Sequence, residues 1–443
     1  MTGSGTLLDP YVIYDVNDLQ AMENDLTAYY ELGQDIDASA TVGWNAGLGF
    51  DPVGDIVTGF EGCFDGKGYT IDSLFINRPL ELYVGLFGYT EEGSGGWIRN
   101  VGLTNCDITG RYWVGALVGF HEWRGAQAIS DCYSTGIING HGTSVAGIGG
   151  LLGYNGSTVE RCYSTAQIDV ESTTGKAQEI GGLIGLNGGW DASEGNITDC
   201  YATGNVTVVS PAGLDATEVG GLIGHDYFGI SLRCYATGNI TVISGDDAEE
   251  IGGFVGYFTN GEVIQCFSTG NVTVIATDRV WGVGGFVGYA DESLSNCYSR
   301  GDVSVTTAAP GAMDGDIGGL VGYLATGETI INSYSTGLVT VAGTFNNVGG
   351  LCGQNLGTIT DSFWDTETSG QATSDGGTGK TTAQMKTEST FTGASWDFTT
   401  IWTICSGVNS DYPCLLGVTP SCVLAPVVPY VINKAYALAR EEL

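Results

Sequence analysis

The sequence predicts an all-β fold, a parallel β-helix or β-solenoid of about eight or nine coils with short helical caps at both ends. Two alternating phrases support this prediction. The first, of the type V/I-G-G-L/F-V/I/L-G, begins at residues 148, 180, 219, 251, 283, 317 and 348, and "VGALVG" at 114–119 is a weaker copy. The second, of the type C/S-Y/F-S/A-T/R-G/A, begins at residues 132, 162, 200, 234, 266, 297 and 333. Successive copies lie about 26–39 residues apart, the period of stacked supersecondary units.

The second phrase has the two-residue period of a half-buried strand. In "CYATGNVTV" at 200–208, small and aliphatic residues alternate with polar and aromatic ones. We expect one strand of about nine residues with the valines inward, and Gly204 marks a position where the strand could bend. A short apolar segment before each cysteine gives a second strand, and the Gly-Gly phrase gives a third. Because helical patterns are absent between them, a β-helix is favoured over βαβ folds, and a β-propeller is the second reading.

The ends of the chain differ from its middle and define four regions: an N-terminal cap and first coil at 1–80, the repeats at 81–365, a C-terminal cap at 366–403 and a tail at 404–443. A solenoid needs caps because its end strands have unpaired edges. We expect a short amphipathic helix at 15–26 over the first coil. A helix at 381–391, followed by aromatic residues, would close the other end. The segment 429–443 reads as a short helix in the tail.

Charge and hydropathy limit the classes of partner. The chain has 14 basic and 50 acidic residues, a formal net charge of −36, and 42% of its residues are hydrophobic. Such a balance disfavours nucleic acid and anionic membranes, which both attract basic surfaces. No basic, apolar leader follows Met1, so no signal peptide is visible. The longest apolar run, at 423–432, is short and interrupted by prolines, so no membrane span is expected.

The two phrases also resemble a known family. The combination of "GGLVGY" at 318–323 with the repeated CYSTG-type phrases is similar to the GLUG repeat of bacterial and archaeal surface proteins and filamentous-haemagglutinin-like adhesins. The segments "FDGKGYTIDSL" at 64–74 and "FWDTETSGQATSDGGTGKTTAQM" at 363–385 resemble the flanks of such repeats. The resemblance covers roughly residues 3–403. It implies a β-solenoid with a surface or adhesive role, and it implies no catalytic residues.

A cysteine column follows from the repeat. Seven cysteines occupy the same repeat position, which Ser333 and Ser362 continue: Cys106, Cys132, Cys162, Cys200, Cys234, Cys266 and Cys297. Equivalent residues of a solenoid stack about 4.8 Å apart with parallel side chains, an arrangement poorly suited to disulfides. We therefore expect small buried thiols, with disulfides or a metal site as alternatives. In the tail, a disulfide among Cys405, Cys414 and Cys422 is an open alternative.

An aromatic residue follows each of the later cysteines and forms a second column: Tyr133, Tyr163, Tyr201, Tyr235, Phe267, Tyr298 and Tyr334. With the cysteines inward, these rings form a surface stripe that could hold sugar rings or another protein. If the glycine reverses the facing, they belong to the core. Both readings stay open.

The connections after the Gly-Gly phrases vary most in sequence. Because insertions in a solenoid gather on one edge, they are candidates for a glycan-binding edge, with ordinary turn decoration as the alternative. Aromatic and polar residues combine there in Glu122, Trp123, Arg124, Trp190, Asp191, Tyr227 and Phe228. The acidic residues Asp246, Asp247, Glu249 and Glu250 are the candidates for weak Ca²⁺ binding, although their spacing matches no calcium loop. No other cofactor is expected.

These observations predict a non-enzymatic surface or virion protein, a rigid rod that presents a glycan- or host-surface-binding edge. A polysaccharide-degrading β-helix enzyme and a self-associating fibre or sheath subunit are the alternatives. Neither the three histidines nor any pair of carboxylates has a spacing that indicates catalysis. The expected location is extracellular, on the cell surface or in a virion. Oligomer or fibre assembly would use the C-terminal tail.

Overall fold

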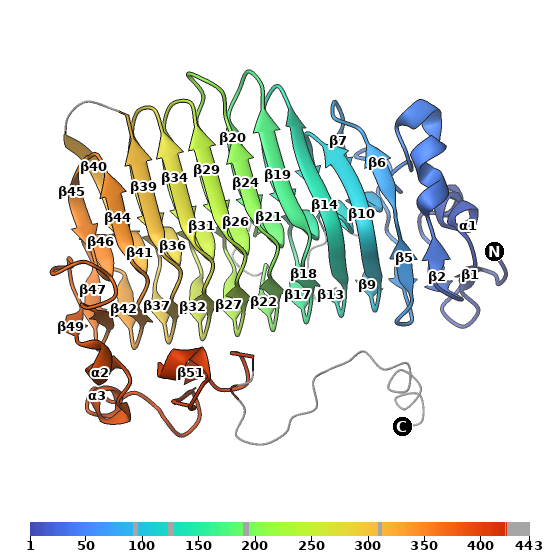
Figure 1. Ribbon diagram of the computed structural model, residues 1–443. Coiled ribbons are helices and arrows are strands. Elements are labelled where there is room, and N and C mark those ends of the chain that lie inside the picture. Colours follow the sequence, from blue (N-terminus) through green and yellow to red (C-terminus); the bar gives the residue numbers. More distant parts are fainter. Residues whose placement is uncertain (92–95, 123–127, 189–194, 309–311, 421, 423–443) are drawn as a thin grey trace.

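A computed structural model confirms the parallel β-solenoid (Figure 1) and describes residues 1–91, 96–122, 128–188, 195–308, 312–420 and 422. Each full coil passes in turn through four walls, which we name A, B, C and D. Within every wall, strands of successive coils pair in parallel, with equivalent residues opposite one another, as in Val206 with Ile240 and Ile223 with Val255. The repeat of the sequence is therefore the repeat of the coils.

Wall A holds twelve short strands. They are β1 (Tyr11–Ile13), β2 (Tyr29–Leu32), β4 (Cys63–Asp65), β9 (Trp97–Arg99), β13 (Ala128–Ser130), β17 (Thr158–Glu160), β22 (Ile197–Thr198), β27 (Ile230–Leu232), β32 (Glu262–Ile264), β37 (Leu294–Ser295), β42 (Thr329–Ile331) and β47 (Thr358–Thr360).

Wall B carries the cysteine phrase in two columns of strands that share β10 and β14. The column nearer wall A contains β3 (Ile36–Asp37), β5 (Thr70–Asp72), β10 (Gly102–Gly110), β14 (Tyr133–Gly142), β18 (Tyr163–Ser164), β23 (Tyr201–Ala202), β28 (Tyr235–Ala236), β33 (Phe267–Ser268), β38 (Tyr298–Ser299), β43 (Tyr334–Ser335), β48 (Phe363–Asp365) and β49 (Thr378–Lys380). The other contains β6 (Phe75–Asn77), β19 (Gln167–Ser172), β24 (Val206–Val209), β29 (Ile240–Ser244), β34 (Val272–Ala276), β39 (Val303–Thr307) and β44 (Val339–Ala342).

Walls C and D hold nine strands each. Wall C consists of β7 (Leu82–Val84), β11 (Tyr112–Val114), β15 (Val145–Gly149), β20 (Ala177–Gly181), β25 (Ala216–Gly220), β30 (Ala248–Gly252), β35 (Val280–Gly284), β40 (Ala312–Gly318) and β45 (Thr344–Gly349). Wall D consists of β8 (Phe87–Thr90), β12 (Val118–His121), β16 (Leu152–Asn155), β21 (Ile184–Asn187), β26 (Ile223–Tyr227), β31 (Val255–Thr259), β36 (Val287–Asp291), β41 (Val321–Leu324) and β46 (Cys352–Asn355).

The Gly-Gly phrase forms a corner, so the prediction that it is a single strand is wrong. In "VGGLIG", β25 ends at Gly220, Gly221 and Leu222 turn the chain, and β26 begins at Ile223. A Cβ atom on Gly220 would lie 1.8 Å from the carbonyl oxygen of Ile223. Only glycine fits so tight a turn, because every other residue carries that atom.

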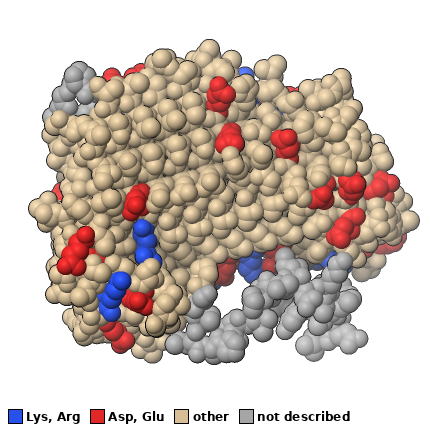
Figure 2. Space-filling view, viewed as in Figure 1, with Lys and Arg blue, Asp and Glu red and all other residues tan. Residues whose placement is uncertain are grey.

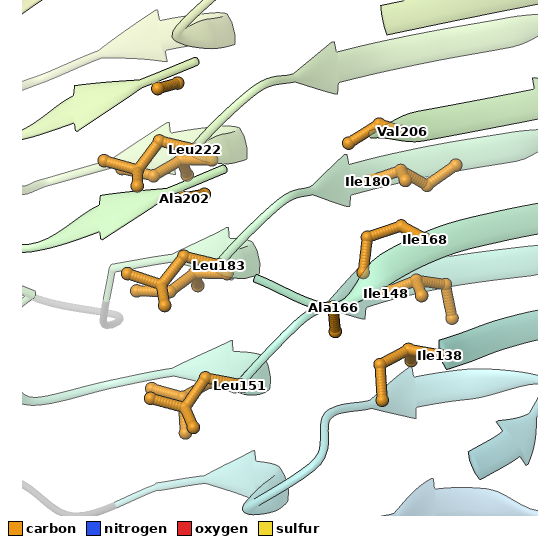
Figure 3. Close-up of a cluster of buried hydrophobic side chains, with 14 of the residues drawn as sticks. Ile138, Ile148, Leu151, Ala166, Ile168, Ile180, Leu183, Ala202, Val206 and Leu222 are labelled. Atoms are coloured by element: carbon orange, nitrogen blue, oxygen red, sulfur yellow. The ribbon is translucent and has the colours of Figure 1, made fainter. Parts of the chain in front are cut away.

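The core consists of columns of aliphatic side chains that repeat from coil to coil (Figure 3). Leu151, Leu183 and Leu222 stack inside the Gly-Gly corner, and each has no exposed surface. Ile138 and Ile168 are register partners on the neighbouring strands β14 and β19 of wall B, and both are fully buried. Burial of each such side chain contributes about 1.5–3 kcal/mol, so the columns are the main stabilising feature of the solenoid.

The cysteine phrase forms one long strand, as predicted, in β10 and β14. From the copy at 162 on, it bends in its middle and divides into two strands. At the bend, a Cβ atom on Gly204 would lie 1.8 Å from the carbonyl oxygen of Ala166 in the neighbouring coil. The asparagine after that glycine bonds to the next coil, since Asn205 Oδ1 accepts from the backbone N–H of Asn239 at 2.9 Å. Asn239 Oδ1 accepts equally from Asn271. The asparagine of the repeated T-G-N sequence thus provides a hydrogen-bond acceptor for a backbone N–H that the bend leaves out of the sheet.

Short helices lie at both ends, and each predicted helix is divided. The first becomes α1 (Val16–Gln20), with its N-terminus capped by Asp15, and the 3₁₀ helix η1 (Ala21–Asn24). The second becomes α2 (Thr382–Met385) and α3 (Glu388–Thr392), because Thr387 adopts an extended backbone between them. Further 3₁₀ helices are η2 (Ser39–Gly43), η3 (Asn45–Gly47) and η4 (Asn409–Asp411).

The C-terminal elements pack below the last coils (Figure 1). They include the antiparallel pair β50 (Trp402–Thr403) and β51 (Cys414–Leu415). Cys414 and Cys422 form a disulfide, whereas Cys405 is a free thiol. The helix expected at 429–443 lies outside the described residues. Within the described part of the chain, no helix combines the length and the apolar character needed to cross a membrane.

Charge is sparse on the surface. Figure 2 shows one face of the molecule, covered mainly by uncharged residues, with acidic side chains scattered over it and several of them closer together toward the N-terminal end. Many of the few arginines pair with carboxylates of a neighbouring coil, such as Arg161 with Asp131 and Arg233 with Asp199. The negative charge is therefore distributed over this surface and does not form one large patch on it.

Candidate functional site

The aromatic column of wall B is a continuous stack of rings, which we call the tyrosine ladder. Its members are Tyr133, Tyr163, Tyr201, Tyr235, Phe267, Tyr298 and Tyr334. Neighbouring ring centroids lie 4.7–5.1 Å apart and the ring planes differ by 1–7°. The rings project outward because the residue before each ring, a cysteine or in one coil Ser333, and the small residue after it both point into the core.

The ladder is divided into an exposed and a covered half. Tyr133, Tyr163, Tyr201 and Tyr235 are half-buried, whereas Phe267, Tyr298 and Tyr334 are at most 2% exposed. The covered half packs against the C-terminal elements, where the Tyr334 hydroxyl donates to the Pro413 carbonyl at 2.5 Å. The rings thus face outward in every coil, and the C-terminal elements, not a reversal of facing at the glycine, bury the last three.

Stacking limits what the exposed half can bind. The faces of Tyr163 and Tyr201 are covered by neighbouring rings, and a Cβ on Gly102 would meet the ring of Tyr133 at 2.2 Å. Only ring edges and hydroxyl groups reach the surface. Burial, with neighbouring tyrosines, raises the pKa of Tyr163 and of Tyr201 to about 12, so these hydroxyls stay protonated donors at neutral pH. The exposed half is a row of hydroxyl groups and offers no flat platform for a sugar ring.

The cysteine column lies inside wall B next to the ladder. Its seven members are buried free thiols: Cys106, Cys132, Cys162, Cys200, Cys234, Cys266 and Cys297. The thiol of Cys200 donates to the Thr198 carbonyl at 3.3 Å, and its sulfur accepts from the backbone N–H of Cys162 at 3.3 Å. Ser333 makes the same pair of bonds, to Ile331 and from Cys297. The column therefore links the coils by hydrogen bonds.

The variable connections lie where wall D passes into wall A, so they share one edge of the solenoid. Glu122 follows β12 and contacts the Tyr89 hydroxyl. Tyr227 ends β26, is 39% exposed and lies against Phe228, with the ring centroids 4.3 Å apart. Trp123, Arg124, Trp190 and Asp191 lie outside the described residues. Of the seven candidates, Tyr227 and Phe228 form a contact pair.

The four acidic candidates do not meet at one point. Asp246 and Asp247 gather with Asp278 of the next coil, where Asp247 and Glu249 both pair with Arg279. Glu250 lies beside Glu218 and His225 in a different group. Calcium binding by this segment stays a prediction.

Wall C contains a column of bulged residues that sequence reasoning missed. One residue in each coil is skipped by the pairing, and from the first coil on these residues are Tyr83, Trp113, Gly147, Glu179, Glu218, Glu250 and Gly282. Each has a positive φ, between 55° and 67°. The aromatic ones contact outward residues of wall D, as Tyr83 does Tyr89 and Trp113 does Phe120 and Tyr154. The signal in the sequence is a glutamate directly before the Gly-Gly phrase in three successive coils.

Three of these bulged glutamates surround a histidine, and we call Glu179, Glu218, Glu250 and His225 the carboxylate cluster. His225 lies in the outward column of wall D, between Leu186 and Tyr257. Its Nδ1 is 3.6 Å from Glu218 Oε2, and these side chains are 16% and 19% exposed. Burial and repulsion from Glu218 raise the pKa of Glu179 and of Glu250 to about 7. Burial lowers the pKa of His225, but Glu218 outweighs this effect and raises it above 6.5.

A second polar column runs inside wall D. Thr90 Oγ1 bonds to His121 Nδ1 at 2.7 Å. Asn155 Nδ2 donates to Asn187 Oδ1, and Asn187 Nδ2 to Asp226 Oδ1, both at 2.7 Å. All of these side chains are fully buried, and burial lowers the pKa of His121 to about 3. The column keeps polar groups satisfied in the core and is structural.

His121→Asn is expected to make the protein less sensitive to acid, because asparagine fills the same column in the next two coils. The folded state holds His121 neutral, whereas the unfolded chain protonates it below about pH 6.5, so wild type loses stability as the pH falls from there. Between about pH 6.5 and 4.5, this group should remove about 2–3 kcal/mol from wild type alone. Urea unfolding of both proteins at each pH measures it, and an equal pH dependence would contradict the assignment.

Comparison with known proteins identifies the type of repeat that this sequence contains. A family model of the GLUG motif matches residues 177–207, 247–273 and 280–304. The chain is 35% identical over 423 residues to a protein of Evansella cellulosilytica provisionally named a Gly-rich membrane protein, covering 93% of this chain and 45% of that one. It is 35% identical over 211 residues to halomucin of Haloquadratum walsbyi, covering 46% of this chain and 2% of halomucin. The chain thus spans less than half of either relative.

One solved structure also aligns, at 17% identity and a TM-score of 0.44, over 94% of both chains. It is described as a provisionally assigned immunoglobulin A1 protease from Bacteroides ovatus. A likeness at this level carries no argument about the chemistry of the present chain.

Proposed function

The chain is a GLUG-repeat protein, and from this premise we propose that it is a non-enzymatic surface protein that binds glycans at the edge between walls D and A. GLUG repeats in a β-solenoid fit a surface or structural protein. The names of the two relatives, a membrane protein and a halomucin, support a place at the cell surface. The edge is proposed as the binding part because the variable connections gather there.

The exposure of Tyr227 carries this proposal. Its ring is 39% exposed, while Phe228 and His225 contact it edge-on, at interplanar angles of 66° and 79°. A ring held in this way keeps surface available for the apolar face of a sugar, and a tyrosine adds a hydroxyl for hydrogen bonding. The ladder lacks this property, because its rings cover one another. Tyr227 is therefore the aromatic side chain best suited to a glycan among the predicted residues that the structure describes.

A glycan array probed with the full chain tests the proposal. We expect Tyr227→Ala to weaken binding to the best glycan about tenfold, since one aromatic contact is worth about 0.5–1.5 kcal/mol. Trp123→Ala and Trp190→Ala test whether the connections of the neighbouring coils also contribute to glycan binding. The matched control is Tyr201→Ala, which removes a ladder ring and should leave binding unchanged. Absence of any glycan ligand, or loss of binding in Tyr201→Ala alone, would contradict the edge as the binding site.

The enzymatic alternative makes a different prediction for the same glycans. A polysaccharide-degrading protein would release new reducing ends from the glycan that it binds, and the proposed binding protein would release none. Incubation of the wild-type chain with each array ligand in soluble form, followed by a reducing-end assay, distinguishes the two. If the amount of released reducing ends increased in proportion to the protein concentration, the non-enzymatic assignment would be overturned.

A further inference from the structure

The carboxylate cluster on the outer side of walls C and D has the composition of a metal site. Glu179, Glu218 and His225 each present one ligand atom, and these atoms all lie within 4.8 Å of one another. An ion with ligand distances of about 2.1 Å holds its ligand atoms at most about 4.2 Å apart. Inward shifts of less than about 1 Å per atom would bring all three to one ion. Glu250 of the next coil is not one of these three residues, but Glu218 and His225 both act on it electrostatically.

Independent evidence for a ligand comes from buried atoms without a hydrogen bond. Glu179 Oε2 and His225 Nε2 each expose less than 1 Å² and have no hydrogen-bond partner, and Glu218 Oε2 has only the 3.6 Å ion pair with His225 Nδ1. A buried polar atom left unpaired costs about 1–3 kcal/mol, and more when the group is charged. A ligand shared by these side chains would remove that cost.

Basic residues compensate the charge of the cluster only in part. Lys176, which acts electrostatically on Glu250, forms its ion pair with Asp215 at 2.8 Å. His225 supplies at most one positive charge against three carboxylates. The cluster is closed along the stack by Leu186 in the coil before and by Tyr257, whose ring centroid lies 4.7 Å from that of His225. A cation is the ligand that this negative, partly desolvated group would attract.

We propose that Glu179, Glu218 and His225 bind one divalent first-row transition-metal ion, with Glu250 as an additional carboxylate ligand. The imidazole selects this class of ion, because Ca²⁺ and Mg²⁺ prefer sites made of oxygen atoms alone. The ion would join three successive coils at the outer corner of walls C and D. His225 also contacts Tyr227 of the proposed glycan-binding edge. Glu218→Gln leaves both of these rings in place, so it should weaken metal binding and keep glycan binding, which distinguishes the two proposals.

The acidic group of Asp246, Asp247 and Asp278 provides an internal comparison. It also contains three donors, but Asp247 pairs with Arg279, and the group lacks a histidine and any buried unpaired atom among those that the structure describes. It therefore carries no proposal. Asp278→Asn and Glu249→Gln are the matched controls, since both remove a nearby carboxylate outside the carboxylate cluster.

Titration of the metal-free full chain with Mn²⁺, followed by the electron paramagnetic resonance signal of the free ion, tests the proposal. We expect one bound Mn²⁺ per chain, with affinity at least about tenfold weaker in Glu218→Gln and in His225→Asn, because each removes one ligand. Asp278→Asn and Glu249→Gln should bind as wild type does. Mn²⁺ should also raise the melting temperature of wild type and of both controls.

Thermal unfolding without metal shows whether the ligand variants fold. Glu218→Gln should melt at or above the temperature of wild type, because it removes repulsion within the cluster, and Mn²⁺ should then shift it little. The proposal is overturned if no stoichiometric Mn²⁺ binds to wild type, if Glu218→Gln and His225→Asn bind as wild type does, or if binding is lost in Asp278→Asn.

Discussion

Replacing Gly221 by alanine is expected to destabilise the solenoid by about 3 kcal/mol or more, which is at the upper end for overpacking. The new Cβ would lie 2.2 Å from the carbonyl oxygen of Gly253 in the next coil, and real Cβ atoms do not approach backbone so closely. The neighbouring backbone cannot retreat, because Gly253 has the same relation to Gly285, at 2.0 Å. One methyl group would thus separate two coils and disturb those that follow.

Gly43→Ala is the matched control for this prediction. A Cβ on Gly43 would meet nothing within 4 Å, and its φ is not positive, so this substitution should be neutral or slightly stabilising. Chemical unfolding of the two variants and wild type measures the difference. If Gly221→Ala lost less than about 1 kcal/mol, close packing of backbones at the Gly-Gly corner would not be what the glycines provide.

Trp402→Ala should release the C-terminal elements from the covered half of the tyrosine ladder. Trp402 is fully buried, its ring centroid lies 4.7 Å from that of Trp396 and 6.0 Å from that of Tyr334, and its Nε1 donates to Asn296 Oδ1 at 3.1 Å. Removing a buried tryptophan costs about 3–5 kcal/mol. Because this cost acts on a small peripheral unit, we expect local undocking while the coils stay folded.

Amide hydrogen exchange measures this effect. Protection should fall in β50, β51, α3 and the backbone beside Tyr298, and stay unchanged in the central coils. Trp97→Ala is the control, since Trp97 is half-buried in β9, the fourth strand from the N-terminal end of wall A, and contacts Arg99. Loss of protection throughout the solenoid in Trp402→Ala would show that the cap and the coils unfold as one unit.

The coil was predictable because the same pattern of inward and outward residues recurs in every repeated phrase. Inward Cys200 and Val206 and outward Tyr201 follow from a two-residue period, and the structure has this facing throughout. The corner at Gly220 and Gly221 was not predictable in the same way. A strand and a tight turn both allow an apolar phrase with glycines, and only the contact between neighbouring backbones distinguishes them.

The candidate site was less accessible from sequence for a related reason. Tyr227 and Phe228 stood out by their chemistry, whereas the carboxylate cluster depends on a bulge that aims Glu179 and Glu218 at His225. A left-handed backbone at a glutamate is locally unfavourable, and contacts between neighbouring coils impose it. The local sequence therefore does not predict it. The recurrence of glutamate before the Gly-Gly phrase was visible, but its meaning required the neighbouring wall.

The in-register columns make the coil the natural unit of length change in this protein. Excision of residues 234–265 would join Arg233 to Cys266 and place Cys200 beside Cys266, Tyr201 beside Phe267 and Leu222 beside Phe286, all of them pairs of like position. No turn would need redesign, since every connection inside the remaining coils is retained. Recombination between repeats can therefore lengthen or shorten the rod in steps of about 4.8 Å, one strand spacing at a time, without passing through a misfolded intermediate length.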